Sequence, residues 1–371
     1  MRVAITGATG NVGTALLRRL AREPDVEVVG IARRCPEPDA GQPYGVVRWH
    51  AADLGDPACL HPLAERLAGV DAVVHLAWQV QPGQQPARLR QLNLGGSRHV
   101  LNAMLAAGVP KLVHASSIAA YAPGPADRRV DEDWPVTGVG RSGHGVDKAA
   151  VEAMLTDAER DYPVLRVTRL RTAPVLRGDA GAAGIRHLLG RFTPVPVLRP
   201  GRLPVVPRHR RLRVQVVHAD DAAEAYLRAV RSDRTGAFNI AAEPAVDGAL
   251  LATELGGWAV PVPLGLLRLL TRAAGRARPA APDEGWAEPG AAVPLLDCSR
   301  AERELGWRPR RDAREALRQM LAGTATGPGT ASPGTASPGT ASPGTASPGT
   351  AGPPPRPAER VTAARPADRH G

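Results

Sequence analysis

The chain has 371 residues, which predicts one large domain or two modest ones, because a single hydrophobic core stops growing at about 250–300 residues. Hydrophobic residues make up 43% and charged residues 22%, a balance typical of a folded protein. No apolar run is long enough to cross a bilayer, and the opening residues lack a signal-peptide layout. We therefore expect a cytoplasmic protein that makes no membrane contact.

The cysteines and histidines do not have the spacing of a metal site. Cys35, Cys59 and Cys298 lie far apart, which fits neither a disulfide framework nor a zinc site. The histidines show no ligand spacing either. We therefore expect a reducing compartment and no bound metal.

The formal net charge is +11, and arginine carries most of it. A basic chain can bind nucleic acid, but it can equally bind a small ligand that carries phosphate. The 6 Trp, 4 Tyr and 2 Phe are too few for the stacking platforms of single-strand binders. We therefore expect a small-molecule substrate and no nucleic acid, with a composition bias of the genome as the alternative source of the charge.

Short apolar runs alternate with amphipathic segments through the first half of the chain. The apolar runs predict strands at 2–6, 26–32, 46–50, 71–76, 111–116 and 163–170. The amphipathic segments predict helices at 11–22, 57–67, 85–107 and 144–160. Strands that alternate with helices predict an α/β fold with a doubly wound parallel sheet of the Rossmann type.

The regularity fades after residue 172. Strands are predicted at 214–217 and 237–240, and helices at 220–231, 264–276 and 313–321. We predict a dinucleotide-binding domain over 1–172 and a smaller, mainly substrate-binding part over 173–322, with a strand and helix near 214–231 returning to the sheet. Residues 323–371 contain four copies of TASPG, which cannot bury a core, and predict a disordered tail.

A glycine-rich turn joins the first predicted strand to the first predicted helix. Its sequence is GATGNVG, in which one glycine allows the tight turn, the next a close approach of a pyrophosphate, and the last close packing of helix on strand. The helix N-terminus then offers free N–H groups to the phosphates. The predicted cofactor-binding residues of this turn are Gly7, Gly10, Asn11, Val12 and Gly13.

The end of the second predicted strand indicates which dinucleotide is bound. A carboxylate there would bind the ribose 2′-hydroxyl of NAD, but this sequence has Arg33 and Arg34 and no acid. Two guanidinium groups suit a 2′-phosphate. We therefore favour NADP over NAD, with solvated surface arginines as the alternative.

Further motifs follow in a fixed order along the chain. They are Asp53-Leu54, His75-Leu76-Ala77, the segment NLGGS from Asn93, the segment SSIAAY from Ser116, and QVVHADD at 215–221. Together with the glycine turn they resemble the extended short-chain dehydrogenase/reductase superfamily, NAD-dependent epimerase/dehydratase family, from residue 2 to about 321. The resemblance implies that the cofactor contacts Asp53, Leu54, Leu76, Ala77, Asn93 and Lys148.

The family's reaction centre is a serine or threonine with a Tyr-x-x-x-Lys motif, in which the lysine lies one helical turn from the tyrosine. The resemblance implies Ser117 as the serine and Lys148 as the lysine, but the tyrosine position holds His144. Histidine titrates near pH ~6.5 and can carry a proton. We therefore predict Ser117, His144 and Lys148 as catalytic residues of an epimerase, dehydratase or oxidoreductase.

An imidazole is shorter than a phenol, so a second hypothesis stays open. It is a cofactor-binding sensor or interaction protein with weak or no turnover. Tyr121 offers another hydroxyl nearby, with a pocket wall as its alternative role, and Thr172 stands where the family usually has proline.

Six arginines and no acid lie between residues 199 and 213. Guanidinium groups suit phosphates, and the resemblance implies that this half binds nucleotide sugars. A solvated basic loop is the alternative. The leucines and arginines of 264–278 indicate packing on the second part more than a membrane surface. The resemblance also leaves a homodimer open.

Overall fold

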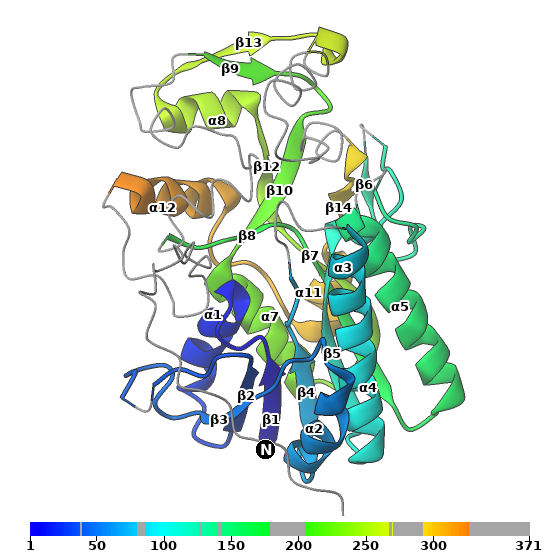
Figure 1. Ribbon diagram of the computed structural model, residues 1–371. Coiled ribbons are helices and arrows are strands. Elements are labelled where there is room, and N and C mark those ends of the chain that lie inside the picture. The colour runs from blue at the N-terminus through cyan, green and yellow to red at the C-terminus, as the bar shows by residue number, and fades with distance from the viewer. Residues whose placement is uncertain are drawn as a thin grey trace, which may run out of the picture. The chain divides into compact units, whose positions relative to one another are not determined.

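The computed structural model describes residues 1–37, 39–79, 86–125, 128–139, 143–178, 205–266, 269 and 292–325. At its centre lies a sheet of seven strands in the order β11-β7-β5-β4-β1-β2-β3 (Figure 1). All the neighbouring strands pair in parallel. The strands are β1 (Arg2–Thr6), β2 (Glu27–Ala32), β3 (Arg48–Ala51), β4 (Ala72–His75), β5 (Lys111–Ser117), β7 (Arg166–Thr172) and β11 (Gly236–Ile240). The strand order reverses between β1 and β4, and open α/β sheets bind ligands at that point.

Helices cover both faces of the sheet, because the strands bury apolar side chains on both sides. Along β1, Val3 and Ile5 pack into one core and Ala4 into the other, as the alternation of side chains on a strand requires. The first core contains α1 (Asn11–Leu20), α7 (Ala219–Arg231) and α11 (Ser299–Leu305). The second core contains α2 (Leu60–Leu67), α4 (Gly96–Ala106) and α5 (Gly143–Asp161). A 3₁₀ turn at Pro57–Cys59 leads into α2.

Smaller elements lie beyond the carboxyl ends of the large sheet's strands (Figure 1). Among the described residues they form three small sheets and two further helices. Two of the sheets and both helices surround a third apolar core, whereas the sheet of β14 and β6 packs into a fourth. The sheets are β12 (Ala242–Asp247), β10 (Arg213–His218) and β8 (Val175–Leu176); β13 (Trp258–Pro261) and β9 (Val205–Arg208); and β14 (Leu295–Leu296) and β6 (Arg129–Val130). The helices are α8 (Gly248–Leu255) and α12 (Ala313–Ala325). No helix within the described residues has the length and apolarity to span a membrane.

The α/β class and the doubly wound parallel sheet are confirmed. One detail was wrong: β10 was expected to return to the large sheet, but it pairs with β12 and β8 instead. The strand that joins the large sheet is β11, which fills the position beside β7. The division at residue 172 stays a prediction. The helix expected at 264–276 lies largely outside the described residues, as does nearly all of the tail.

The helix expected over 85–107 is a composite. It consists of α3 (Pro86–Arg90), a π-helical turn (Gln91–Gly95) and α4. Such π turns within helices often mark functional positions. This one carries Asn93, one of the predicted cofactor-binding residues.

Candidate active site

The turn after β1 has the geometry of a phosphate cradle. Gly7 has φ +69°, and a Cβ there would lie 2.7 Å from the backbone N of Ala77 on the loop after β4. A Cβ on Gly13 would lie 2.5 Å from the carbonyl oxygen of Gly7. The helix α1 begins after Gly10 with no side-chain hydrogen bond capping it. Its first turn therefore offers backbone N–H groups and the positive end of the helix dipole to an anion.

This turn opens into a cleft of about 230 Å³ at the carboxyl ends of the central strands. The cleft is lined by many of the predicted cofactor-binding residues: Gly7, Gly10, Arg33, Asp53, Leu54, Leu76, Ala77 and Asn93. Asn11, Val12, Gly13, Arg34 and Lys148 are not among its lining residues. Arg33 and Arg34 are both exposed, but only Arg33 lines the cleft.

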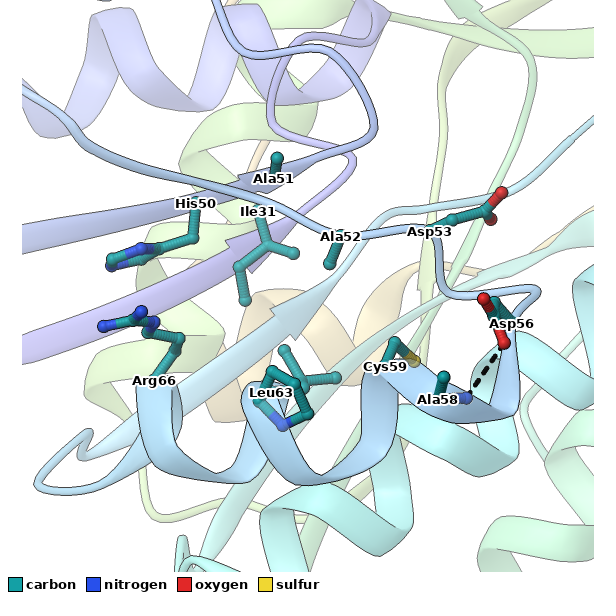
Figure 2. Close-up of a pocket in the computed structure, with 11 residues that line it drawn as sticks. Ile31, His50, Ala51, Ala52, Asp53, Asp56, Ala58, Cys59, Leu63 and Arg66 are labelled. Carbon is teal, nitrogen blue, oxygen red and sulfur yellow. Dashed lines mark hydrogen bonds between the residues drawn. The ribbon is translucent and has the colours of Figure 1, made fainter.

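A second hollow of about 380 Å³ lies beside the cleft, between the end of β3 and α2. Figure 2 shows His50 and Arg66 at one end of it and Asp53 at the other. Burial and the nearby Arg66 lower the pKa of His50, so its imidazole is neutral near pH 7. The residues that line both cavities are Ile31, Ala52 and Asp53.

Asn93 holds the loop that follows β4. Its side-chain Oδ1 accepts a hydrogen bond from the backbone N of Gln79 at 2.8 Å, and its Nδ2 donates to the carbonyl oxygen of Gln79 at 3.0 Å. This pair of bonds fixes the backbone directly after Trp78. Asn93, a predicted cofactor-binding residue, thus also holds in place the loop that lines the cleft.

His75 ties β4 to its neighbours at the floor of the cleft. Its Nδ1 lies 2.7 Å from Oγ1 of Thr6 and its Nε2 lies 2.9 Å from Oγ of Ser97. Since the Ser97 hydroxyl donates to the carbonyl of Asn93, His75 donates from Nε2 and accepts at Nδ1. Burial, with a smaller effect of the Lys148 charge, lowers the pKa of His75 to about 3. It is therefore a neutral structural residue at pH 7.

The three predicted catalytic residues lie on two elements that pack together. Ser117 ends β5, and its Oγ accepts a hydrogen bond from the backbone N of Ala119 at 3.1 Å. His144 and Lys148 lie in the first turns of α5. A Cβ on Gly145 would lie 2.5 Å from the carbonyl oxygen of Ala119, so this glycine lets α5 approach the turn after Ser117.

Lys148 is buried, with only 4% of its surface exposed. Its Nζ donates to the carbonyl oxygen of Ala115 at 2.5 Å, two residues before Ser117. Burial lowers the pKa of this ammonium to about 7, and the carboxylate of Glu152 opposes that shift. Lys148 can therefore exchange a proton near neutral pH.

Trp78 contacts both Lys148 and His144, and sequence reasoning did not identify it. Nζ of Lys148 lies 3.5 Å from the centroid of the indole ring. Nε1 of the indole donates to Nδ1 of His144 at 3.0 Å, and the two rings meet edge to face. The only sequence signal was its place directly after His75-Leu76-Ala77.

Tyr121 does not supply a hydroxyl to this site. It is fully buried, its hydroxyl donates to Oδ1 of Asn239 at 2.7 Å, and Nη1 of Arg171 donates to it at 2.9 Å. Burial raises the pKa of the phenol well above its usual value. Thr172, at the proline position of the family pattern, pairs with Ser117 across β5 and β7.

The arginine-rich segment before β10 is only partly described. Arg208, Arg210 and Arg211 are exposed and Arg213 is half-buried, whereas Arg199 and Arg202 lie outside the described residues. None of these four described arginines lines the cleft. Their expected contact with a substrate diphosphate stays a prediction. Within the described part of the chain, no cluster of three metal-ligating side chains is found.

The chain is similar to known proteins both in sequence and in structure. The family model described as "NAD dependent epimerase/dehydratase family" matches residues 3–241. An uncharacterised protein of Mycobacterium tuberculosis is 28% identical over 322 residues, which cover 85% of this chain and 29% of the relative. The chain therefore spans less than a third of that relative's length.

Two further relatives are similar over nearly their whole length. The dTDP-6-deoxy-L-talose 4-dehydrogenase (NAD(P)(+)) of Kitasatospora kifunensis is 29% identical over 353 residues, 88% of this chain and 96% of that protein. The UDP-glucose 4-epimerase of Thermus thermophilus, solved in complex with NAD, superimposes with a TM-score of 0.65 at 23% identity, over 88% of this chain and 100% of that chain. This likeness confirms the fold. Because the family model matches more than half of the sequence, the chain belongs to the NAD-dependent epimerase/dehydratase family.

Proposed function

We propose that this protein binds NAD(P) in the cleft and interconverts a hydroxyl and a carbonyl group on a nucleotide sugar or a related compound. The observation that carries the proposal is the cradle itself: the turn at Gly7 approaches Ala77 so closely that any Cβ would collide with it. The uncapped first turn of α1 and the glycine-lined wall fit a pyrophosphate. When bound, the nicotinamide supplies or accepts the hydride.

The chain's own residues supply the remaining chemistry. Ser117 hydrogen-bonds the reacting oxygen, as the family pattern implies. Lys148 lies near enough to the end of β5 to bond the Ala115 carbonyl, and its pKa near 7 makes it an exchangeable proton source. His144 stands at the family's tyrosine position, one helical turn before Lys148, and takes part in handling the proton on the reacting oxygen.

NADP is the favoured cofactor. The strand β2 ends at Ala32 without a carboxylate, and Arg33 follows as an exposed side chain at the cleft. A guanidinium group there can pair with the 2′-phosphate of NADP, whereas NAD carries no phosphate at that position. Asp53, at the junction of the cleft and the hollow of Figure 2, is the proposed contact for the adenosine end.

A nucleotide sugar is the proposed substrate class for two reasons. The Kitasatospora relative acts, by its name, on a dTDP-deoxysugar, and the Thermus relative is a UDP-glucose epimerase. The exposed arginines 208, 210 and 211 precede β10, in the part of the chain that lies beyond the strand ends. Guanidinium groups in that place suit a diphosphate.

Two observations favour a second candidate function, a cofactor-binding protein without turnover. The tyrosine of the family's motif is absent, and the indole of Trp78 covers the ammonium of Lys148 at 3.5 Å. In both features the catalytic groups differ from the arrangement that the family pattern implies. The protein would then report the cofactor's presence or redox state through binding alone.

Substitution of His144 by Tyr and by Ala separates the two candidates. Calorimetry with oxidised and reduced NAD and NADP tests the binding step first, and absence of heat at millimolar cofactor would exclude both. Hydride transfer is then followed at 340 nm with dTDP- and UDP-sugars. Loss of at least about tenfold in rate on His144→Ala supports an enzyme that uses His144. A silent native protein with an active His144→Tyr variant supports the binding protein.

A further inference from the structure

Trp78 is held from three sides in the described structure. Asn93 bonds both backbone groups of Gln79, so the backbone after Trp78 is fixed. The face of its indole lies against Nζ of Lys148, which is itself held by the carbonyl of Ala115. The edge of the indole donates to the imidazole of His144. The indole thus contacts two residues of α5, one of which is anchored to β5, while the backbone after it is held by Asn93.

The direction of the Trp78–His144 bond sets the protonation of the imidazole. An indole N–H is a donor and never an acceptor, so Nδ1 of His144 must accept and cannot carry a proton. A neutral imidazole carries one ring proton, which then belongs to Nε2. A proton on Nδ1, in either the other tautomer or the imidazolium, would set two N–H groups against each other across 3.0 Å.

We infer that Trp78 is a positioning residue that holds His144 in the neutral Nε2–H tautomer, so that any group bound at Nε2 meets a hydrogen-bond donor and not an acceptor. A tyrosine in this place could both give and take a proton at one oxygen. His144 held in this way polarises a carbonyl oxygen and opposes proton abstraction from a hydroxyl, because Nε2 already carries a proton and the lone pair of Nδ1 is occupied by the indole N–H. The inference rests on the proposed function, and it adds that the site favours the carbonyl form of the substrate.

The tautomer can be read directly by nuclear magnetic resonance of the full chain labelled with ¹⁵N. Long-range ¹H–¹⁵N correlations distinguish a protonated ring nitrogen from a bare one, and a His144→Gln sample assigns the signals. At pH 8 we expect His144 to show a bare Nδ1 and a protonated Nε2. The tautomer is read from the native protein itself, and the variant serves only to assign the signals.

Trp78→Phe removes the indole N–H and keeps an aromatic ring against Lys148. We expect the ratio of Nε2–H to Nδ1–H tautomers of His144 to fall about fivefold, the effect of one lost hydrogen bond. Trp49→Phe is the matched control, because the Nε1 of Trp49, on the edge strand β3, also donates a bond of 3.0 Å, to the carbonyl of Tyr44 in the turn before that strand. That variant should leave the His144 signals unchanged.

Three results would overturn the inference. They are a protonated Nδ1 in the native protein, an imidazolium at pH 8, and a Trp78→Phe spectrum identical to the native one. Cofactor calorimetry on the same samples keeps the two proposals apart. Cofactor heat with the wrong tautomer overturns the inference about Trp78 and leaves the proposed function standing. The expected tautomer without cofactor heat overturns the proposed function, and with it the preference for a carbonyl substrate, but leaves the tautomer assignment standing.

Discussion

Glu152 on α5 and Arg171 on β7 form a two-armed ion pair inside the protein. Nη2 of Arg171 lies 2.7 Å from Oε2 of Glu152, and Nε lies 3.0 Å from Oε1. The side chain of Arg171 is 7% exposed and that of Glu152 is 5% exposed. The Ser116 hydroxyl also donates to Glu152. The pair therefore joins α5, which carries His144 and Lys148, to the strand beside Ser117.

Replacement of Arg171 by Leu should lower the free energy of unfolding by about 3–5 kcal/mol, because it leaves the carboxylate of Glu152 buried without a positively charged partner. The Arg171→Leu/Glu152→Leu double variant should recover part of that loss, since it removes both charges. Urea unfolding measures all three proteins. Arg160→Ala, which breaks exposed pairs on the same helix, should leave the midpoint unchanged. A single variant as stable as the native protein would contradict the role given to this pair.

Gly7→Ala should abolish NAD(P) binding, because the new Cβ would lie 2.7 Å from the backbone N of Ala77 at a φ of +69°. Gly108→Ala is the matched control: Gly108 has φ +68°, but nothing lies within 4 Å of its Cβ position. Both variants carry a similar backbone strain, of order 1–3 kcal/mol. Calorimetry should therefore show cofactor heat for Gly108→Ala and none for Gly7→Ala. Equal affinities in the two variants would mean that this turn does not hold the cofactor.

Local signals predicted more of this protein than contacts between distant segments did. The strand β1 was predicted with its observed bounds, since its apolar run ends at the glycine turn. The helix expected over 85–107 contains a π turn instead, where Asn93 turns toward Gln79. Strands of two residues such as β8 and β14 exist only through pairing with remote partners and leave no periodic pattern.

The candidate site divides in the same way. The glycine turn and the spacing from His144 to Lys148 are short-range patterns, and the structure places them as spacing implies. Trp78 depends on the packing of the loop after β4 against α5, 66 residues further along the chain. No spacing rule joins such positions, which is why this contact emerged only from the structure.

Arg33→Ser should weaken NADP binding by about 10-fold to 100-fold and leave NAD binding nearly unchanged, because it removes a charge-assisted bond to the 2′-phosphate. Arg34→Ser should have a smaller effect, since Arg34 does not line the cleft. Titration calorimetry with both cofactors measures the six affinities of the native protein and the two variants. If Arg33→Ser weakens both cofactors equally, or neither, then Arg33 does not select between them.

The buried Lys148 should make the protein more stable as the pH rises. Burial lowers its pKa from 10.5 to about 7, so between these values the unfolded chain holds a proton that the folded chain has lost. The free energy of unfolding then increases with pH in that window, by up to about 1.4 kcal/mol per pH unit. The contacts of the ammonium with Ala115 and Trp78 favour the charged form and reduce this slope.

Lys148→Met should therefore unfold with a flatter pH profile than the native protein between pH 7 and pH 9.5, and it should be the more stable of the two at pH 7. Urea titrations across this range measure both profiles. Parallel profiles would show that Lys148 stays protonated in the fold, and that its contacts with Ala115 and Trp78 offset the cost of burial.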